Sequence, residues 1–180
     1  MQNKLIFSVN EVFSSYLREE EKFVIPPYQR GYKWRETAIR QLLNDVNDFK
    51  CDDDSDKFYC LQNITIVRRP KIDSDSAKNI PGYKVIDGQQ RLTTSLVILS
   101  CLLECKNLQP FRNKLRYDIR TKTEDFLQKY ILGKADILSD WEHFLNNYSE
   151  EDFNHQDIFY LYSARKTVEQ WLNEKHNDKV

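Results

Sequence analysis

The sequence predicts an α+β fold, in which a small mixed sheet holds a buried central helix and is followed by a helical segment. Three observations predict this class. Short apolar strand patterns lie only in the first two thirds of the chain, and a largely apolar run at 92–103 directly follows one of them. After about residue 120 only helical periodicity remains. We therefore expect one α/β domain over 1–120 and the start of a helical domain over 121–180.

The individual elements follow from caps, periodicity and breakers. Ser8 with Glu11 three residues later predicts a helix start, and the helix should run to about residue 18. The central helix should cover 88–106, with Asp87 as its N-cap and Gln90 closing a capping box. Strands are predicted at 23–25, 58–67 and 83–86. The other helices are predicted at 35–49, 123–132, 137–145 and 157–172.

Composition excludes several classes of protein. The chain has 180 residues, a net charge of −1 and 13% aromatic residues, which argues against both disorder and a globally basic nucleic-acid binder. Four cysteines occur without zinc-ligand spacing, so we expect neither a metal centre nor a disulfide framework. No signal peptide opens the chain and no apolar run could span a bilayer, which predicts a cytoplasmic protein without membrane contact.

The segment 85–91, Val-Ile-Asp-Gly-Gln-Gln-Arg, joins a buried strand to a helix through a tight turn. The first N–H groups of such a helix lack intrahelical partners and carry the positive end of the helix dipole. Gly88 leaves room for a ligand, and Arg91 in the first turn can make a bidentate phosphate contact. The segment predicts a phosphate site. An ordinary capped helix with a solvated Arg91 is the alternative.

A second segment, Ile-Pro-Pro-Tyr-Gln-Arg-Gly-Tyr-Lys-Trp at 25–34, has neither helical nor strand periodicity. Gln29 and Arg30 offer hydrogen-bond donors, and the aromatic rings, Tyr28, Tyr32 and Trp34, offer stacking surfaces. Donors next to aromatics suit a nucleotide or a flipped base. The alternative is a loop packed on its own domain, with Arg30 in a structural ion pair.

Two common chemistries are excluded by what the sequence lacks. No G-x-x-x-x-G-K-[ST] occurs, so a nucleotide site here is not a P-loop. The three histidines, His143, His155 and His176, lie in polar helical surroundings and form no His-Asn-His constellation. We expect them at the surface, and we expect this chain alone not to cleave DNA.

Together the two segments resemble the N-terminal domain of the GmrSD restriction endonucleases, first catalogued as domain of unknown function 262. The matching stretches are IPPYQRGYKW at 25–34, YCLQNITIV at 59–67 and VIDGQQRLTT at 85–94, with the helix QLLNDV at 41–46 between them. The similarity covers 8–105 well and the helical remainder loosely. At Gln62 many members have Gly, so a close backbone approach is either missing or replaced by a side-chain contact.

The resemblance implies a ParB/sulfiredoxin-like fold in which a strand, a turn and a helix hold nucleotide phosphates. It implies binding of a nucleoside triphosphate, with Mg²⁺ and hydrolysis left open, in a restriction protein active in phage defence. DNA would be cut by a separate C-terminal HNH-type nuclease domain or subunit, which this chain lacks. The residues carried over are Gln29, Arg30, Asp87, Gly88, Gln89, Gln90 and Arg91, with Tyr28 as a weaker transfer.

Three functions remain open at this stage. The first is a nucleotide-binding module with slow hydrolysis, in which Asp87 caps the helix, positions a Mg²⁺-bound water, or does both. The second is a module without turnover that clamps a DNA phosphate or senses a modified base. The third is an interaction domain whose helical part docks the nuclease. In the first reading the loop at 25–34 and the turn at 87–91 lie side by side and share one polyphosphate.

Overall fold

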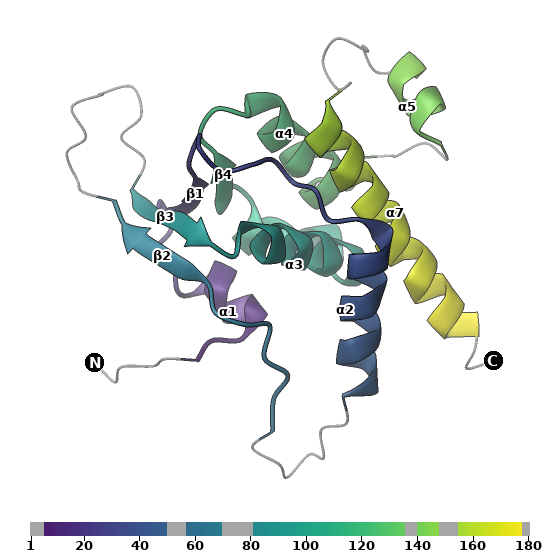
Figure 1. Cartoon of the computed structure of the whole chain (residues 1–180), viewed down its shortest axis with the longest axis horizontal. Coiled ribbons are helices and arrows are strands. Elements are labelled where there is room, and N and C mark those ends of the chain that lie inside the picture. The colour runs from purple at the N-terminus through teal and green to yellow at the C-terminus, as the bar shows by residue number, and fades with distance from the viewer. Residues whose placement is uncertain (1–5, 50–56, 70–80, 136–139, 148–154, 178–180) are drawn as a thin grey trace.

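The computed structural model describes residues 6–49, 57–69, 81–135, 140–147 and 155–177 (Figure 1). The fold is mixed α+β, as predicted. The first half contains α1 (Val9–Ser14), β1 (Lys22–Ile25), α2 (Glu36–Asp48), β2 (Thr65–Arg68), β3 (Gly82–Asp87) and α3 (Gln89–Leu102). The second half contains η2 (Cys105–Phe111), β4 (Leu115–Tyr117), α4 (Thr121–Phe126), η3 (Leu127–Leu132), α5 (Trp141–Asn147) and α7 (Gln156–Asn177).

Four strands form one small sheet in the order β2-β3-β1-β4. Strand β1 pairs in parallel with both β3 and β4, whereas β2 pairs with β3 in antiparallel fashion. Because β1, β3 and β4 run in the same direction, the segments that follow them leave the sheet at the same edge. The loop after β1 and the turn after β3 are therefore neighbours at this carboxyl edge.

Helix α3 is the central helix of the domain and lies beside the sheet in Figure 1. Leu92, Leu96 and Val97 are buried, and they share one hydrophobic cluster with Ile25 and Val85 of the strands. This confirms that the helix after residue 88 is buried against the sheet. The helix ends at Leu102, four residues earlier than predicted, and a 3₁₀ helix follows it.

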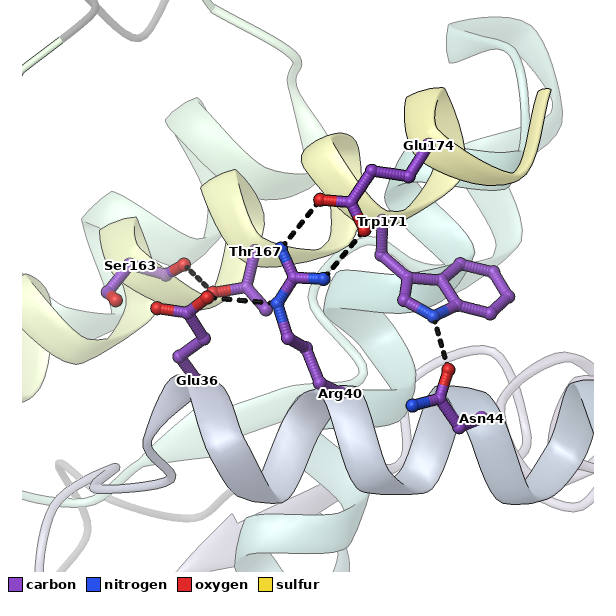
Figure 2. Close-up of polar contacts among 7 residues, drawn as sticks. All are labelled: Glu36, Arg40, Asn44, Ser163, Thr167, Trp171 and Glu174. Atoms are coloured by element: carbon purple, nitrogen blue, oxygen red, sulfur yellow. Dashed lines mark hydrogen bonds and ion pairs between the residues drawn. The ribbon is translucent and has the colours of Figure 1, made fainter. Parts of the chain in front are cut away.

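The C-terminal helix α7 lies against α2 and α3 and contributes to the same hydrophobic cluster as the sheet, through Leu161 and Val168. Figure 2 shows its polar contacts with α2. The guanidinium of Arg40 donates to both carboxylate oxygens of Glu174, at 2.8 and 2.9 Å. The indole N–H of the buried Trp171 donates to Asn44 at 2.8 Å. Apolar side chains from both sides of residue 120 share this cluster. The division into two domains near residue 120 stays a prediction.

Two strand predictions need correction. The predicted strand at 58–67 is regular only from Thr65, because residues 57–64 run without ladder hydrogen bonds past α2 and the start of α3. Strand β4 was not predicted, since three residues are too short to show an alternation.

The capping box of Ser8 and Glu11 is confirmed, although its helix ends at Ser14. The predicted helix at 123–132 is present as α4 continued by a π-helical stretch, and the one at 137–145 begins only at Trp141 within the described residues.

The exposure of the histidines agrees with the prediction made for them. The side chains of the three histidines, His143, His155 and His176, are all exposed. None of the described helices has both the length and the apolar character that a bilayer-spanning helix needs.

Candidate functional site

The candidate site lies at the carboxyl edge of the sheet, where the loop after β1 meets the N-terminus of α3. This edge is the common ligand position in sheets with parallel strands. Gln29 in the loop donates from Nε2 to the backbone carbonyls of Val85, at 3.2 Å, and Ile86, at 2.6 Å. The loop is thus tied to the end of β3, which confirms that the two segments lie side by side.

Two further amides fasten the loop from the side of α3. Gln89 donates from Nε2 to the carbonyl of Arg30 at 2.9 Å, and Gln90 donates to the carbonyl of Gly31 at 3.0 Å. The Oε1 atom of Gln90 accepts the backbone N–H of Lys33 at 2.9 Å. Both glutamines are more than nine-tenths buried. A loop that forms no regular structure must satisfy its backbone groups elsewhere, and these amides do so.

The three glutamines predicted to bind nucleotide, Gln29, Gln89 and Gln90, therefore use their amide nitrogens on the protein's own backbone. They hold the shape of the loop. The buried Oε1 of Gln89 has no hydrogen-bond partner among the described residues. A buried acceptor without a partner costs free energy, so this atom is available to a donor on a ligand or water.

The start of α3 differs from the prediction. Asp87 is the last residue of β3, and the N-cap is Gly88, whose φ of 94° and ψ of 8° are left-handed. No side chain caps the helix, because the Asp87 carboxylate accepts from Arg91 and the Gln90 amide donates to the carbonyl of Gly31. The predicted capping box at Asp87 is therefore wrong. Its absence leaves the first N–H groups of a 14-residue helix without a side-chain acceptor.

Arg91 is held in place by three oxygen atoms. Its Nη1 donates to Oε1 of Gln62 at 3.1 Å, and its Nη2 donates to the carbonyl of Asn63 at 2.7 Å and to Oδ2 of Asp87 at 3.0 Å. The Arg91 side chain is 22% exposed, whereas that of Asp87 is 71% exposed. Arg91 is thus a fixed cation at the helix N-terminus, and its ion pair with Asp87 is the contact most open to exchange with a ligand.

Gln62 makes a side-chain contact from a backbone position that favours glycine. Its φ of 69° lies in the left-handed region that favours glycine. A side chain at this position costs backbone strain but supplies the acceptor for Arg91. Sequence reasoning recognised that position 62 was unusual. The pairing with Arg91, 29 residues away, was not predicted.

The aromatic residues of the loop divide into three kinds. Tyr28 is 72% exposed, and Trp34 is half-buried. Tyr32 is fully buried, and its hydroxyl shares a hydrogen bond of 2.9 Å with Thr94 of α3. Burial raises the pKa of the Tyr32 phenol. Tyr32 is therefore part of the core and offers no stacking surface, contrary to the prediction.

Arg30 has an exposed side chain, and no acidic side chain among the described residues pairs with it. The interpretation of Arg30 as one half of a structural ion pair is therefore wrong. Its backbone carbonyl is fixed by Gln89, so the base of the side chain is positioned while the guanidinium faces solvent. A cation in this state can meet an anionic ligand without first breaking an internal contact.

Asp157 in the first turn of α7 was missed as a neighbour of the site. It lies against Gly31, and its Oδ2 accepts the hydroxyl of Thr123 at 2.6 Å and lies 3.6 Å from Nε of Arg120. No sequence pattern links residues so far apart. The only signal was the glycine itself, which marks a close approach of some other group.

The chain is an α+β domain whose sheet edge carries an uncapped helix N-terminus, an arginine held by three oxygen atoms and an exposed arginine, and this arrangement suits an anion. The chain belongs to the family of the GmrSD restriction endonuclease, N-terminal domain, whose model matches residues 9–179. It is thus a GmrSD-like restriction protein part. No curated protein and no solved structure matches the chain at a significant level, so the ParB/sulfiredoxin-like likeness stays a prediction.

Proposed function

We propose that this chain binds a nucleoside triphosphate, with its phosphates at the N-terminus of α3 between Arg30 and Arg91. The observation that carries the proposal is the uncapped start of α3, which the loop after β1 borders and to which it adds a free cation. Helix N-termini that point backbone N–H groups at a ligand favour phosphate. Family membership supports the same reading.

The charges at the site favour an anion. Arg30 brings a positive charge that no acidic side chain in the described part of the chain pairs with, and the positive end of the α3 dipole adds to it. The negative charge of Asp87 opposes both, but Asp87 is exposed and makes a single ion pair with Arg91. A phosphate oxygen that replaces Asp87 on Nη2 of Arg91 would gain a charge-assisted hydrogen bond and release the carboxylate.

The released carboxylate suits Mg²⁺. Magnesium in nucleotide sites is usually held by one or two carboxylates together with the phosphates and water. Among the described residues no cluster of three or more potential metal ligands exists, so a metal would arrive with the nucleotide rather than occupy a preformed centre. Asp87 would then supply one ligand oxygen, in the role proposed for it in slow hydrolysis.

Hydrolysis by this arrangement would be slow, because Asp87 is the only carboxylate of the 87–91 turn. The replacement Asp87→Asn should abolish Mg²⁺-dependent release of phosphate, and it should leave binding in EDTA equal to wild type or tighter, since a repelling charge is removed. Phosphate release by wild type and variant is measured with purified protein. Equal hydrolysis by both proteins would remove Asp87 from the mechanism.

In the whole restriction protein, we propose that this module couples nucleotide binding to the recognition of phage DNA, and that a nuclease domain or subunit of the HNH type makes the cut. The module itself is then a regulator. The competing function is a DNA- or partner-binding module without turnover, which would use the same positive edge on a backbone phosphate.

Isothermal titration calorimetry tests the proposal with ATP, GTP, CTP and UTP in turn, each with and without Mg²⁺. Arg30→Ala should weaken the binding that wild type shows by about ten- to hundredfold, which corresponds to one charge-assisted contact. Arg18→Ala removes the same charge from another exposed position and should bind like wild type. If wild type binds none of the four nucleotides, the proposal is wrong, and fluorescence anisotropy with duplex DNA then tests the competing function.

A further inference from the structure

A hollow lies beside Arg91, at the start of α3 where the phosphates are proposed to bind. Its volume is about 270 Å³, and its walls come from α2, from the segment 59–62 and from the first turns of α3. The lining side chains that matter here are Trp34, Gln41, Asp45, Tyr59, Gln62 and Arg91. Arg91 and Gln62 thus belong both to this hollow and to the contacts that fix the start of α3.

We propose that this hollow is the pocket for the nucleobase and ribose of the nucleotide, with the base stacked on the indole of Trp34. This inference rests on the proposed function and deepens it. It places the uncharged part of the ligand between α2 and the 59–62 segment, while the phosphates stay at Arg30 and the N-terminus of α3.

The walls of the hollow suit a flat ring with polar edges. The half-buried indole of Trp34 offers a face, and stacking on an aromatic ring holds any base, because every base has a π-face. Gln41 offers both a donor and an acceptor, and Asp45 offers acceptors only. The volume lies just under the range of about 300–1,000 Å³ for drug-sized ligands, which suits a base with its ribose better than a whole triphosphate.

The charges of the hollow set the orientation of the ligand. Asp45 accepts the hydroxyl of Tyr59 at 3.4 Å, whereas Gln62, three residues further along the same segment, contacts Arg91. The negative group thus lies where the segment begins, and the positive group lies where it ends. A ligand with a neutral, donor-bearing end and an anionic end fits this polarity. Inorganic triphosphate, which is anionic throughout, satisfies only the Arg91 end.

The test compares two ligands, a nucleoside triphosphate and inorganic tripolyphosphate, by calorimetry on the full chain. Trp34→Leu should weaken binding of the nucleotide by roughly five- to hundredfold and leave tripolyphosphate binding unchanged. Trp34→Phe keeps a flat ring and should restore much of the loss. Arg30→Ala serves as the reference for the phosphate site and should weaken both ligands.

A second variant covers the case in which Trp34→Leu does not fold. Ala38 lines the hollow from α2, so Ala38→Leu narrows it without removing any contact of Trp34. The matched control is Thr37→Leu, which adds a similar side chain at an exposed position of the same helix outside the hollow. Ala38→Leu should weaken the nucleotide alone, and Thr37→Leu should change neither affinity.

The outcomes separate the two proposals. If Trp34→Leu and Ala38→Leu bind the nucleotide like wild type while Arg30→Ala loses it, the base pocket is wrong and the phosphate site stands. An equal loss of both ligands in the pocket variants also overturns the base pocket, since it would mean that they disturb the phosphate site. If wild type binds neither ligand, the proposed function fails and the base pocket fails with it.

Discussion

Asp157, in the first turn of α7, lies directly against the backbone of Gly31 in the loop after β1. A Cβ added to Gly31 would lie 2.8 Å from Cβ of Asp157 and 2.9 Å from its Oδ2. Position 31 therefore requires glycine because another helix approaches it, and not because of its φ angle. The loop is thus held on two sides, by the amides of α3 and by the start of α7.

The first prediction concerns this contact. Gly31→Ala should lower the free energy of unfolding by about 1–3 kcal/mol, because the added methyl group overpacks the contact with Asp157. Urea denaturation measures the change. Asp157→Gly removes the opposing Cβ, so Gly31→Ala should cost much less in that background. Additive effects of the two substitutions would show that the contact does not limit residue 31.

The second prediction concerns Gly88, where the backbone itself demands glycine. Gly88→Ala should destabilise the protein by roughly 1–2 kcal/mol, the cost of a left-handed residue with a Cβ. The new Cβ would also lie 3.0 Å from Cγ1 of Ile64. Gly88→Asn should cost less, since Asn tolerates this conformation. A stability within 0.5 kcal/mol of wild type for Gly88→Ala would contradict the conformation of the turn.

Gly88 is consequently a poor position for blocking phosphate. A side chain there meets Ile64 and strains the turn, so a loss of binding would follow from distortion of the helix start. Gly88→Val would therefore not separate the loss of a phosphate contact from distortion of the turn.

The third prediction concerns Gln90. Gln90→Glu removes the N–H donor to the carbonyl of Gly31 and should cost about 1–3 kcal/mol at neutral pH, the price of an unsatisfied buried acceptor. A protonated glutamic acid can donate to Gly31 and still accept from Lys33, so folding raises the pKa of the new carboxyl group. The loss should be complete above the folded pKa and should disappear below the unfolded pKa, near 4.3.

Urea denaturation between pH 4 and 8 measures this dependence. Gln109→Glu places the same charge on an exposed side chain and should show no such recovery in acid. If the stability of Gln90→Glu stays low at every pH, Gln90 does not bridge the loop in the way described.

The fourth prediction concerns the ion pair in Figure 2. The hydrogen bonds from Arg40 hold the pKa of the Glu174 carboxyl below its ordinary value. Arg40→Met should raise the pKa of Glu174 toward its ordinary value. Arg40→Lys keeps the positive charge but not the two parallel hydrogen bonds, so it should give an intermediate pKa. NMR titration of the Glu174 side chain measures all three.

The sign of the pH dependence follows from the lowered pKa. The ion pair stabilises the fold above the unfolded pKa of Glu174, and this contribution fades as pH falls through the folded pKa. Wild type and Arg40→Met should therefore differ in stability at neutral pH and converge in acid. A Glu174 pKa that is the same in both proteins would mean that the pair does not form in solution.

Caps and hydrophobic periodicity predicted the helices that these short-range patterns define. The Ser8 and Glu11 box, the amphipathic α2 and the apolar α3 were all recognisable, because caps and periodicity act over a few residues. Strand β4 was missed because its three residues are too few to show an alternation, and it is recognisable only by its pairing with β1. Residues 58–64 have strand-like composition, but among the described residues no strand pairs with them.

The location of the candidate site was predicted from the sequence, but the role of each residue in it was not. Sequence motifs indicated that the loop and the helix start meet, and the hydrogen bonds of Gln29 and Gln90 confirm it. Sequence reasoning assigned these amides to a ligand, because donors in a motif read the same whether they face a phosphate or a backbone carbonyl. Only the three-dimensional contacts separate the residues that shape the loop from Arg30, which faces solvent.

The contacts of α7 with α2 and with the loop after β1 have a consequence for synthesis on the ribosome. Arg40 and Glu174 are 134 residues apart, so the loop and α2 emerge from the exit tunnel long before the helix that supports them. Domains generally begin to fold while translation continues, and contacts of this separation must wait. The loop after β1 is therefore translated well before α7, and it can reach its final shape only after α7 has emerged.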